Sequence, residues 1–281
     1  MLGVGSFRIA VVAPGGRIAP EVAERTLALA ASHYPNGEVE IHFHPQCFEK
    51  CGHFAGDDER RVESFVEAAN DPKVDAIWFG RGGYGAGRMA EAAIARLGPA
   101  ARDKVYLGYS DAGALLGALY RAGIGKPTHG PMAGDIRREG GEACVLRALN
   151  YLTKGDKAAL EPTLNGRPTL AYNMAVLSSV LGTPIEPPMQ GHVLMLEEVS
   201  EYMYRTDRFL FQITSTPSVR QVAGIRLGRV SDVPANDPDF VLGEEAVMQH
   251  WCQVAGIPYL GRADIGHDID NKIVPFGRTA R

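Results

Sequence analysis

One serine stands where a nucleophile could act. In "YLGYSDAGALL" a β-prone run ends at Ser110 and a helix-prone run begins at once. A side chain at the carboxyl end of a parallel strand projects into the crevice where ligands bind. Gly108 and Ala112 are small, as a sharp strand-to-helix turn requires. A plain helix N-cap is the alternative interpretation, and the serine taken alone favours that cap.

A serine nucleophile needs a base and a group that orients the base. Of eight histidines, His267 lies in the polar loop "ADIGHDID", and His129 in "THGPM" is its strongest rival. His250 falls within a helical pattern, where we expect it to pack. Glu197 ends the apolar strand "VLMLEEV", where a charge is costly without a partner. The alternative for Glu197 is a surface acid at the end of a strand.

A glycine-rich loop, "GRGGYGAG" from Gly80 to Gly87, matches the GxGxxG pattern of dinucleotide-binding loops. It follows a predicted strand and opens a helix. However, it follows the third strand, and no acid ends the next strand at the usual spacing of about 20 residues. Its free backbone N–H groups could instead bind a transient oxyanion. The pattern leaves both uses open.

A histidine and cysteine cluster invites the idea of a metal site. The segment "HFHPQCFEKCGH" holds His42, His44, Cys47, Cys51 and His53. Three residues separate the two cysteines, and no second CxxC or HxxxH follows. A strand that runs into a loop explains the pattern better, so we expect no metal and no cofactor.

The predicted helices and strands that must position these residues are arranged differently in the two halves of the chain. In the first half, strand-like and helix-like runs alternate, which predicts a doubly wound, mostly parallel sheet. The predicted strands are 7–14, 38–45, 75–80 and 104–110, and the predicted helices are 19–34, 57–71, 86–98, 111–123 and 142–155.

A polar stretch with Pro162, Gly166 and Pro168 then predicts a domain junction. The second half mixes its elements less regularly. Its predicted helices are 173–182, 201–214 and 243–256, and its predicted strands are 191–199, 221–230 and short runs near 258–265 and 272–276. We predict an N-terminal domain over 1–157, a linker over 158–170 and a C-terminal domain over 171–281.

Composition limits the class of protein. The chain has 281 residues and a net charge of −4, which argues against nucleic acid as a partner. No apolar run approaches the roughly 20 residues that span a bilayer, and the N-terminus lacks the basic region of a signal peptide. Four cysteines make no disulfide framework, so we expect a cytoplasmic protein without membrane contact.

Several motifs in a fixed order carry a family resemblance. They are "HFAGDDERRVESFVEAANDP", "AIWFGRGGYGAGRM", "GYSDAGALL", "THGPM", "VLGTPIEP", "LMLEEVSEYMYRTDRFLFQI" and "DIGHDIDNKIVPFG". Together they resemble the LD-carboxypeptidase, or muramoyltetrapeptide carboxypeptidase, family of serine peptidases over nearly the whole chain. The resemblance implies a flavodoxin-like or Rossmann-like N-terminal domain and a smaller C-terminal α/β domain. It also implies a triad of Ser110, Glu197 and His267. One departure is "LAYNMAVL", which lacks the glycines usual at the start of this helix and leaves the triad intact.

The resemblance implies a cytoplasmic hydrolase that releases the terminal D-alanine of a murein tetrapeptide during peptidoglycan recycling, and it suggests a homodimer. The backbone N–H groups of Asp111 and Gly83 would form the oxyanion hole. Tyr84 and Arg205 are candidate substrate contacts. Arg205, in "YMYRTDR", would meet the substrate carboxylate, and its alternative is a surface ion pair.

Three other functions stay open at this point. A related hydrolase of the same family shape would cleave peptidyl or aminoacyl nucleotide conjugates in antibiotic self-immunity. A nucleotide-binding module would use the Gly80–Gly87 loop. A binding protein without catalytic activity would need none of the triad chemistry.

Overall fold

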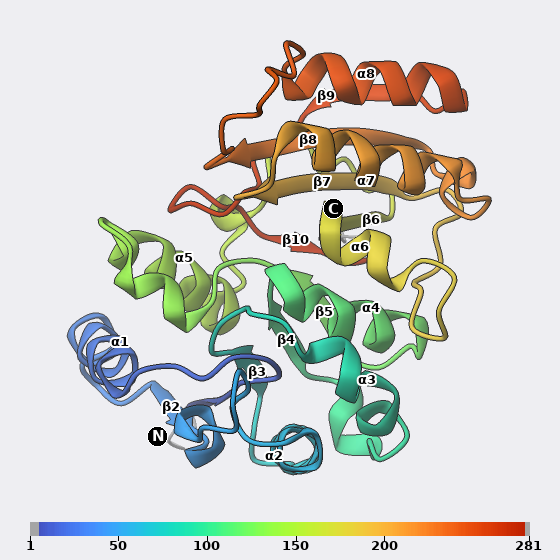
Figure 1. The fold of residues 1–281 in the computed structure, drawn as a ribbon. Helices are drawn as coiled ribbons and strands as arrows, with labels where there is room; N and C mark the ends of the chain where they lie inside the picture. Colours follow the sequence, from blue (N-terminus) through green and yellow to red (C-terminus); the bar gives the residue numbers. More distant parts are fainter. Residues whose placement is uncertain (1–5, 279–281) are drawn as a thin grey trace.

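The protein is built on two sheets, one above the other in Figure 1. The computed structural model describes residues 6–278. The first sheet has the strand order β10-β5-β4-β3-β1-β2, and the second has the order β6-β7-β8-β9. Strands of the first sheet are β1 (Phe7–Val12), β2 (Val39–Phe43), β3 (Ala76–Phe79), β4 (Val105–Gly108), β5 (Lys126–His129) and β10 (Val274–Pro275). Strands of the second are β6 (Thr169–Asn173), β7 (Val193–Val199), β8 (Gly224–Ser231) and β9 (Tyr259–Arg262). All pairings are parallel except that of β10 with β5.

Helices cover both faces of the first sheet (Figure 1). They are α1 (Pro20–His33) and α5 (Gly141–Lys154) on one face, and α2 (Asp58–Asn70), α3 (Ala86–Ile94) and α4 (Gly113–Arg121) on the other. Successive side chains of a strand point to opposite faces. Accordingly, Ile9 and Val11 of β1 belong to one hydrophobic cluster, and Ala10 and Val12 to the other. The doubly wound N-terminal sheet predicted from the sequence is confirmed.

The second sheet is smaller and is also parallel, which confirms the predicted C-terminal α/β unit. Its helices are α6 (Met174–Val180), α7 (Met203–Ser215) and α8 (Glu244–Ala255). They pack in series, α6 on α7 and α7 on α8. β7 is buried over six of its seven residues, from Val193 to Glu198, which places the candidate Glu197 deep in the protein.

The two sheets share one hydrophobic core. Tyr172 of β6 lies across α4, where Gly113 and Gly117 leave room for its ring. A Cβ atom at Gly117 would stand 2.2 Å from the Tyr172 hydroxyl, so no larger residue fits there. Phe276 packs on the same ring at a centroid distance of 5.5 Å. Close packing of this kind holds the second sheet directly against the first.

Two strands, β5 and β6, were not predicted as such. β5 has the sequence "KPTH", with a lysine and a proline and no apolar run, so its pattern does not indicate a strand. β6 begins at Thr169, within the segment that we expected to be linker. β10 falls within the short strand predicted near 272–276, but its return to the first sheet, where it pairs with β5, was not predicted. The exact domain division at 158–170 stays a prediction.

None of the helices within residues 6–278 has both the length and the apolar composition needed to cross a membrane.

Candidate active site

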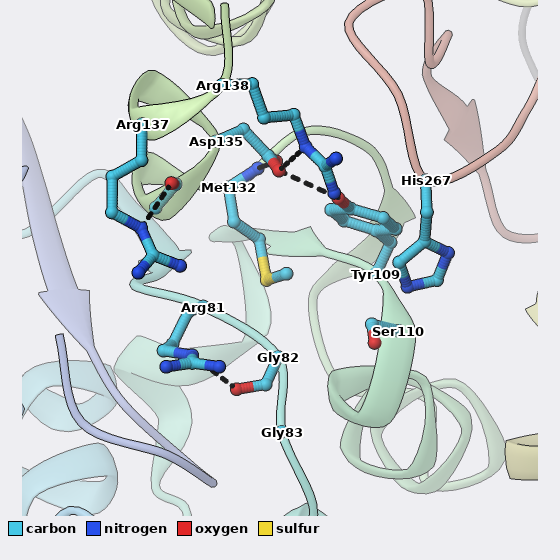
Figure 2. A pocket seen from close by; sticks show the side chains of 11 residues that line it. Arg81, Gly82, Gly83, Tyr109, Ser110, Met132, Asp135, Arg137, Arg138 and His267 are labelled. Atoms are coloured by element: carbon cyan, nitrogen blue, oxygen red, sulfur yellow. Dashed lines mark hydrogen bonds and ion pairs between the residues drawn. The ribbon is translucent and has the colours of Figure 1, made fainter. Parts of the chain in front are cut away.

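The candidate site lies at the carboxyl ends of β3, β4 and β5, where parallel sheets bind ligands. The loops after these strands, together with His267 from the loop after β9, line a cavity of about 320 Å³ (Figure 2). Its lining residues are Arg81, Gly82, Gly83, Tyr109, Ser110, Met132, Gly134, Asp135, Arg137, Arg138 and His267. The cavity therefore contains Ser110, His267, and Gly82 and Gly83 of the glycine-rich loop, including the Gly83 expected in the oxyanion hole.

Ser110 adopts a backbone conformation that non-glycine residues rarely take. Its φ is +61°, between an extended Tyr109 and a short 3-10 turn that leads into α4. Such strain persists only where the surroundings fix it, and it concentrates at functional sites. A Cβ atom at Gly108 would meet the Phe79 ring at 2.5 Å, so the predicted need for a small residue beside the turn is real.

The glycine loop lies directly against the serine. A Cβ atom added to Gly82 would stand 2.7 Å from Ser110 Oγ. At the end of the loop, the Ala86 N–H donates to Asp111 Oδ2 at 2.7 Å. Burial raises the pKa of this carboxyl, and the N–H groups of Ala86 and Gly85 act in the opposite direction. Asp111 thus ties the loop to the serine turn through its side chain.

Two backbone N–H groups near Ser110 are available for a ligand. Asp111 is the second residue of its helical turn, where N–H groups have no intrahelical acceptor. Within the described part of the chain, neither this N–H nor that of Gly83 donates to a protein acceptor. Both remain candidates for the oxyanion hole that the family resemblance implies.

A Gly82→Ala substitution should impair the site without unfolding it. The new Cβ must displace the Ser110 hydroxyl, and a misplacement of about 1 Å lowers rates on the order of 100-fold. We expect this loss in kcat/KM for peptide hydrolysis with an unchanged thermal midpoint. Gly87→Ala in α3 is the matched control, because its Cβ would make only an ordinary contact at 3.8 Å with Ala114. Equal activities of the two variants would contradict the expectation.

His267 is oriented by a buried carboxylate. Its Nδ1 lies 2.6 Å from Glu197 Oε2, although 70 residues separate the two in sequence. Burial by itself lowers the pKa of His267, but the charge and hydrogen bond of Glu197, with smaller effects of Asp135 and Glu198, outweigh it, so the pKa is raised. The Tyr109 ring supports the imidazole at a centroid distance of 4.8 Å. Nε2 is left as the ring nitrogen that can serve a reacting group.

Ser110 and His267 lie on the same side of the cavity in Figure 2. Across residues 6–278, no hydrogen bond joins the serine hydroxyl to the imidazole. Without substrate, catalytic hydrogen bonds are often long and tighten only in the reacting complex. The structure therefore brings Ser110, Glu197 and His267 to one place, with the Glu197–His267 contact formed.

An arginine on β8 fixes the loop that carries His267. Arg229 binds Asp264 at 2.5 Å and makes two contacts with Asp268, one of them at 2.9 Å. These two aspartates lie on either side of His267 in the chain. Sequence reasoning missed Arg229, although an arginine on a strand could have been sought as a partner for "ADIGHDID".

Arg229→Ala should release this loop and lower kcat roughly 10- to 100-fold, because His267, the candidate base, would no longer be held in position. KM should change little, since Arg229 does not line the cavity. Arg226→Ala is the control on the same strand, because Arg226 binds only the backbone carbonyls of Leu260 and Arg262. A kcat effect no larger in Arg229→Ala than in Arg226→Ala would contradict this role.

Other predicted residues lie elsewhere. His129 is fully buried against Asn271, and burial lowers its pKa to about 4; it does not line the cavity. Arg205 pairs with Glu201 at 3.0 Å on the surface and is not a cavity residue. Tyr84 is 59% exposed and packs toward Phe54, again outside the cavity lining.

The histidine and cysteine side chains of the segment from His42 to His53 do not converge on one point. Cys47 is buried and donates to the Val11 carbonyl, whereas Cys51 is exposed. His44 caps the following turn through Nδ1. Among residues 6–278, no group of three or more His, Cys, Asp and Glu side chains is arranged to hold a metal ion.

Several cavity residues were not predicted, namely Arg81, Tyr109, Met132, Asp135, Arg137 and Arg138. Asp135 accepts from the Tyr109 hydroxyl at 2.8 Å and from Arg138 at 3.1 Å. One signal was available in the sequence, because Arg81 stands inside the glycine loop that was expected to bind an anion.

Comparison with known proteins shows which family the chain belongs to. Residues 9–130 match the LD-carboxypeptidase N-terminal domain, and residues 168–281 match the LD-carboxypeptidase C-terminal domain. The chain is 29% identical to the murein tetrapeptide carboxypeptidase of Pseudomonas aeruginosa, over 97% of this chain and 92% of that protein.

Solved structures show the same fold. The crystal structure of a muramoyltetrapeptide carboxypeptidase from Oxalobacter formigenes superimposes with a TM-score of 0.81 at 24% identity, over 96% of this chain and 92% of the other. MccF in complex with glutamyl sulfamoyl guanosine gives 0.77 at 16% identity, over 98% and 92%. The family resemblance predicted from the sequence motifs is confirmed. With its two domains matched in order and its sheets arranged as in these structures, the chain belongs to the LD-carboxypeptidase family.

Proposed function

We propose that this protein is a serine-type LD-carboxypeptidase that releases the terminal D-alanine from a murein tetrapeptide. One observation carries the proposal. A strained serine and a histidine that is hydrogen-bonded to a buried glutamate share one small cavity. This is the arrangement of a nucleophile, a base and a group that orients the base.

The proposed reaction begins when Ser110 Oγ attacks the scissile carbonyl and His267 Nε2 takes its proton. Glu197 holds the proton on Nδ1 and stabilises the imidazolium. The N–H groups of Asp111 and Gly83 would bind the oxyanion, at about 3 kcal/mol per donor. His267 then protonates the leaving amine of the D-residue, and water releases the acyl group by the reverse sequence.

A role in peptidoglycan recycling would place the protein in the cytoplasm. The four cysteines support that location, because all four are free thiols and three of them are buried. The homodimer expected from the resemblance stays a prediction.

The test is an assay of the native protein with a murein tetrapeptide that ends in D-alanine. The matched control is the same peptide ending in L-alanine. We expect D-alanine release from the first and little hydrolysis of the second. Turnover of an aminoacyl sulfamoyl nucleoside with no D-alanine release, or equal turnover of both peptides, would overturn the proposal.

A further inference from the structure

Two arginines of the cavity, Arg81 and Arg137, have no carboxylate partner in the described part of the chain. Within residues 6–278, every ion pair of the cavity involves other groups, since Arg138 pairs with Asp135 and His267 with Glu197. Arg81 donates only to the carbonyls of Gly82 and Arg17, and Arg137 only to that of Gly134. Both guanidiniums therefore keep most of their donors free toward the cavity.

Asp135, the acidic residue among those that line the cavity, is occupied by other partners. Asp135 already accepts from the Met132 N–H at 2.8 Å, the Tyr109 hydroxyl at 2.8 Å and Arg138 at 3.1 Å. The positive charges of the two guanidiniums also repel each other. Burial and then the charge of Arg137 lower the pKa of Arg81. An anion placed between them would relieve this repulsion and use their free donors.

The position of Arg81 and Arg137 in the cavity indicates which part of a substrate they could bind. Figure 2 shows Arg81 and Arg137 on the side opposite Ser110 and His267. The backbone at Gly82, next to Arg81 in the chain, lies so close to Ser110 that an added Cβ would stand 2.7 Å from its hydroxyl. At about 320 Å³, the cavity is near the lower limit of ligand pockets, which start at roughly 300 Å³. A volume of this size suits a small group, such as one terminal amino-acid residue.

We propose that Arg81 and Arg137 bind the terminal α-carboxylate of the substrate, one residue beyond the bond that Ser110 attacks. The inference rests on the proposed function and assigns the binding site of its leaving group. A planar carboxylate matches the donor fork of a guanidinium. The site would make the enzyme a carboxypeptidase, because a peptide without a free carboxylate at that position leaves the two cations unpaired. Arg205, which pairs with Glu201 on the surface, is not needed for this role.

The experiment compares two tetrapeptides, one with a free terminal carboxylate and one with a terminal carboxamide. We expect the native enzyme to prefer the acid in kcat/KM by about 10- to 100-fold, the range of a charge-assisted hydrogen-bond pair. Arg81→Met and Arg137→Met keep an unbranched apolar stem and remove the charge. Each should lower kcat/KM for the acid and leave that for the amide nearly unchanged. Arg205→Ala is the control and should keep the full preference.

A binding measurement separates this inference from the proposed reaction. In the Ser110→Ala background, calorimetry with the same two peptides should show the same preference for the acid, and Arg137→Met should remove it. If the native enzyme releases no D-alanine but this binding preference is present, the proposed function is wrong and the carboxylate site stands. If acid and amide bind and react equally well, or if Arg205→Ala abolishes the preference, the carboxylate site is wrong.

Discussion

Ser110→Ala should abolish hydrolysis of the tetrapeptide, with a fall in kcat on the order of 10⁴-fold or more. The expected loss is large because no other described side chain of the cavity can take over the attack. Among the described residues that line the cavity, only Ser110 and Tyr109 carry a hydroxyl, and none carries a thiol. The Tyr109 hydroxyl donates to Asp135, and burial raises its pKa far above the usual range. D-alanine release under single-turnover conditions measures the effect.

Folding must be checked separately, because Ser110 has a strained backbone. Alanine keeps the Cβ atom, so the left-handed conformation costs about the same before and after the change. The thermal midpoint should therefore stay close to that of the native protein. Ser179→Ala is the matched control, because Ser179 is exposed on α6 and bonds only the carbonyl of Val176. Substantial D-alanine release by a folded Ser110→Ala variant would mean that another group is the nucleophile.

Glu197→Gln should lower kcat by roughly 10⁴-fold, the loss expected when an amide replaces the carboxylate that holds a catalytic imidazole. Glu197 is fully buried, and its Oε2 makes the 2.6 Å contact with His267 Nδ1. A glutamine can donate to Nδ1 and so stabilise the tautomer whose Nε2 carries the proton. That tautomer cannot accept the proton of Ser110.

The pH profile gives a second readout of the same variant. His267 must be neutral to act as a base, so activity should rise with pH as the imidazolium loses its proton. Burial lowers the pKa of His267, and in the native protein the Glu197 charge and hydrogen bond overcome this effect. Without that charge the pKa falls, so the residual activity of Glu197→Gln should reach its plateau at a lower pH than native activity. Glu201→Gln, which removes a surface carboxylate paired with Arg205, should change neither the rate nor the profile. An unmoved acid limb in Glu197→Gln would show that His267 is not the group that titrates.

The sequence predicts the site best where the chemistry depends on local pattern. The turn at Ser110 could be inferred because Gly108, the strand before it and the helix after it are neighbours in the chain. The strain itself could not, since a φ of +61° depends on the packing of Phe79 and of the glycine loop. Glu197 and His267 were assigned by family motifs, because a contact across 70 residues leaves no periodic signal in one sequence.

The strands and side-chain roles that could not be predicted from the sequence depend on contacts with residues that are distant in the chain. β5 is a strand because β4 and β10 lie on either side of it, although "KPTH" has little intrinsic strand character. Arg205 and Arg137 are both arginines in polar helical surroundings, and no local pattern distinguishes the one paired with Glu201 from the one that faces the cavity. Arg137 faces the cavity because the loops after β3, β4 and β5 meet there, which the local sequence does not reveal.

The return of β10 to the first sheet has a mechanical consequence for His267. The segment that carries this histidine leaves the second sheet at Arg262 and enters the first at Val274, so it is a covalent bridge between the two sheets. Ser110 is attached to the first sheet and Glu197 to the second. Any change in the angle between the sheets must therefore alter the reach of the imidazole to the hydroxyl, and the antiparallel pairing of Val274 with His129 limits how far that angle can open.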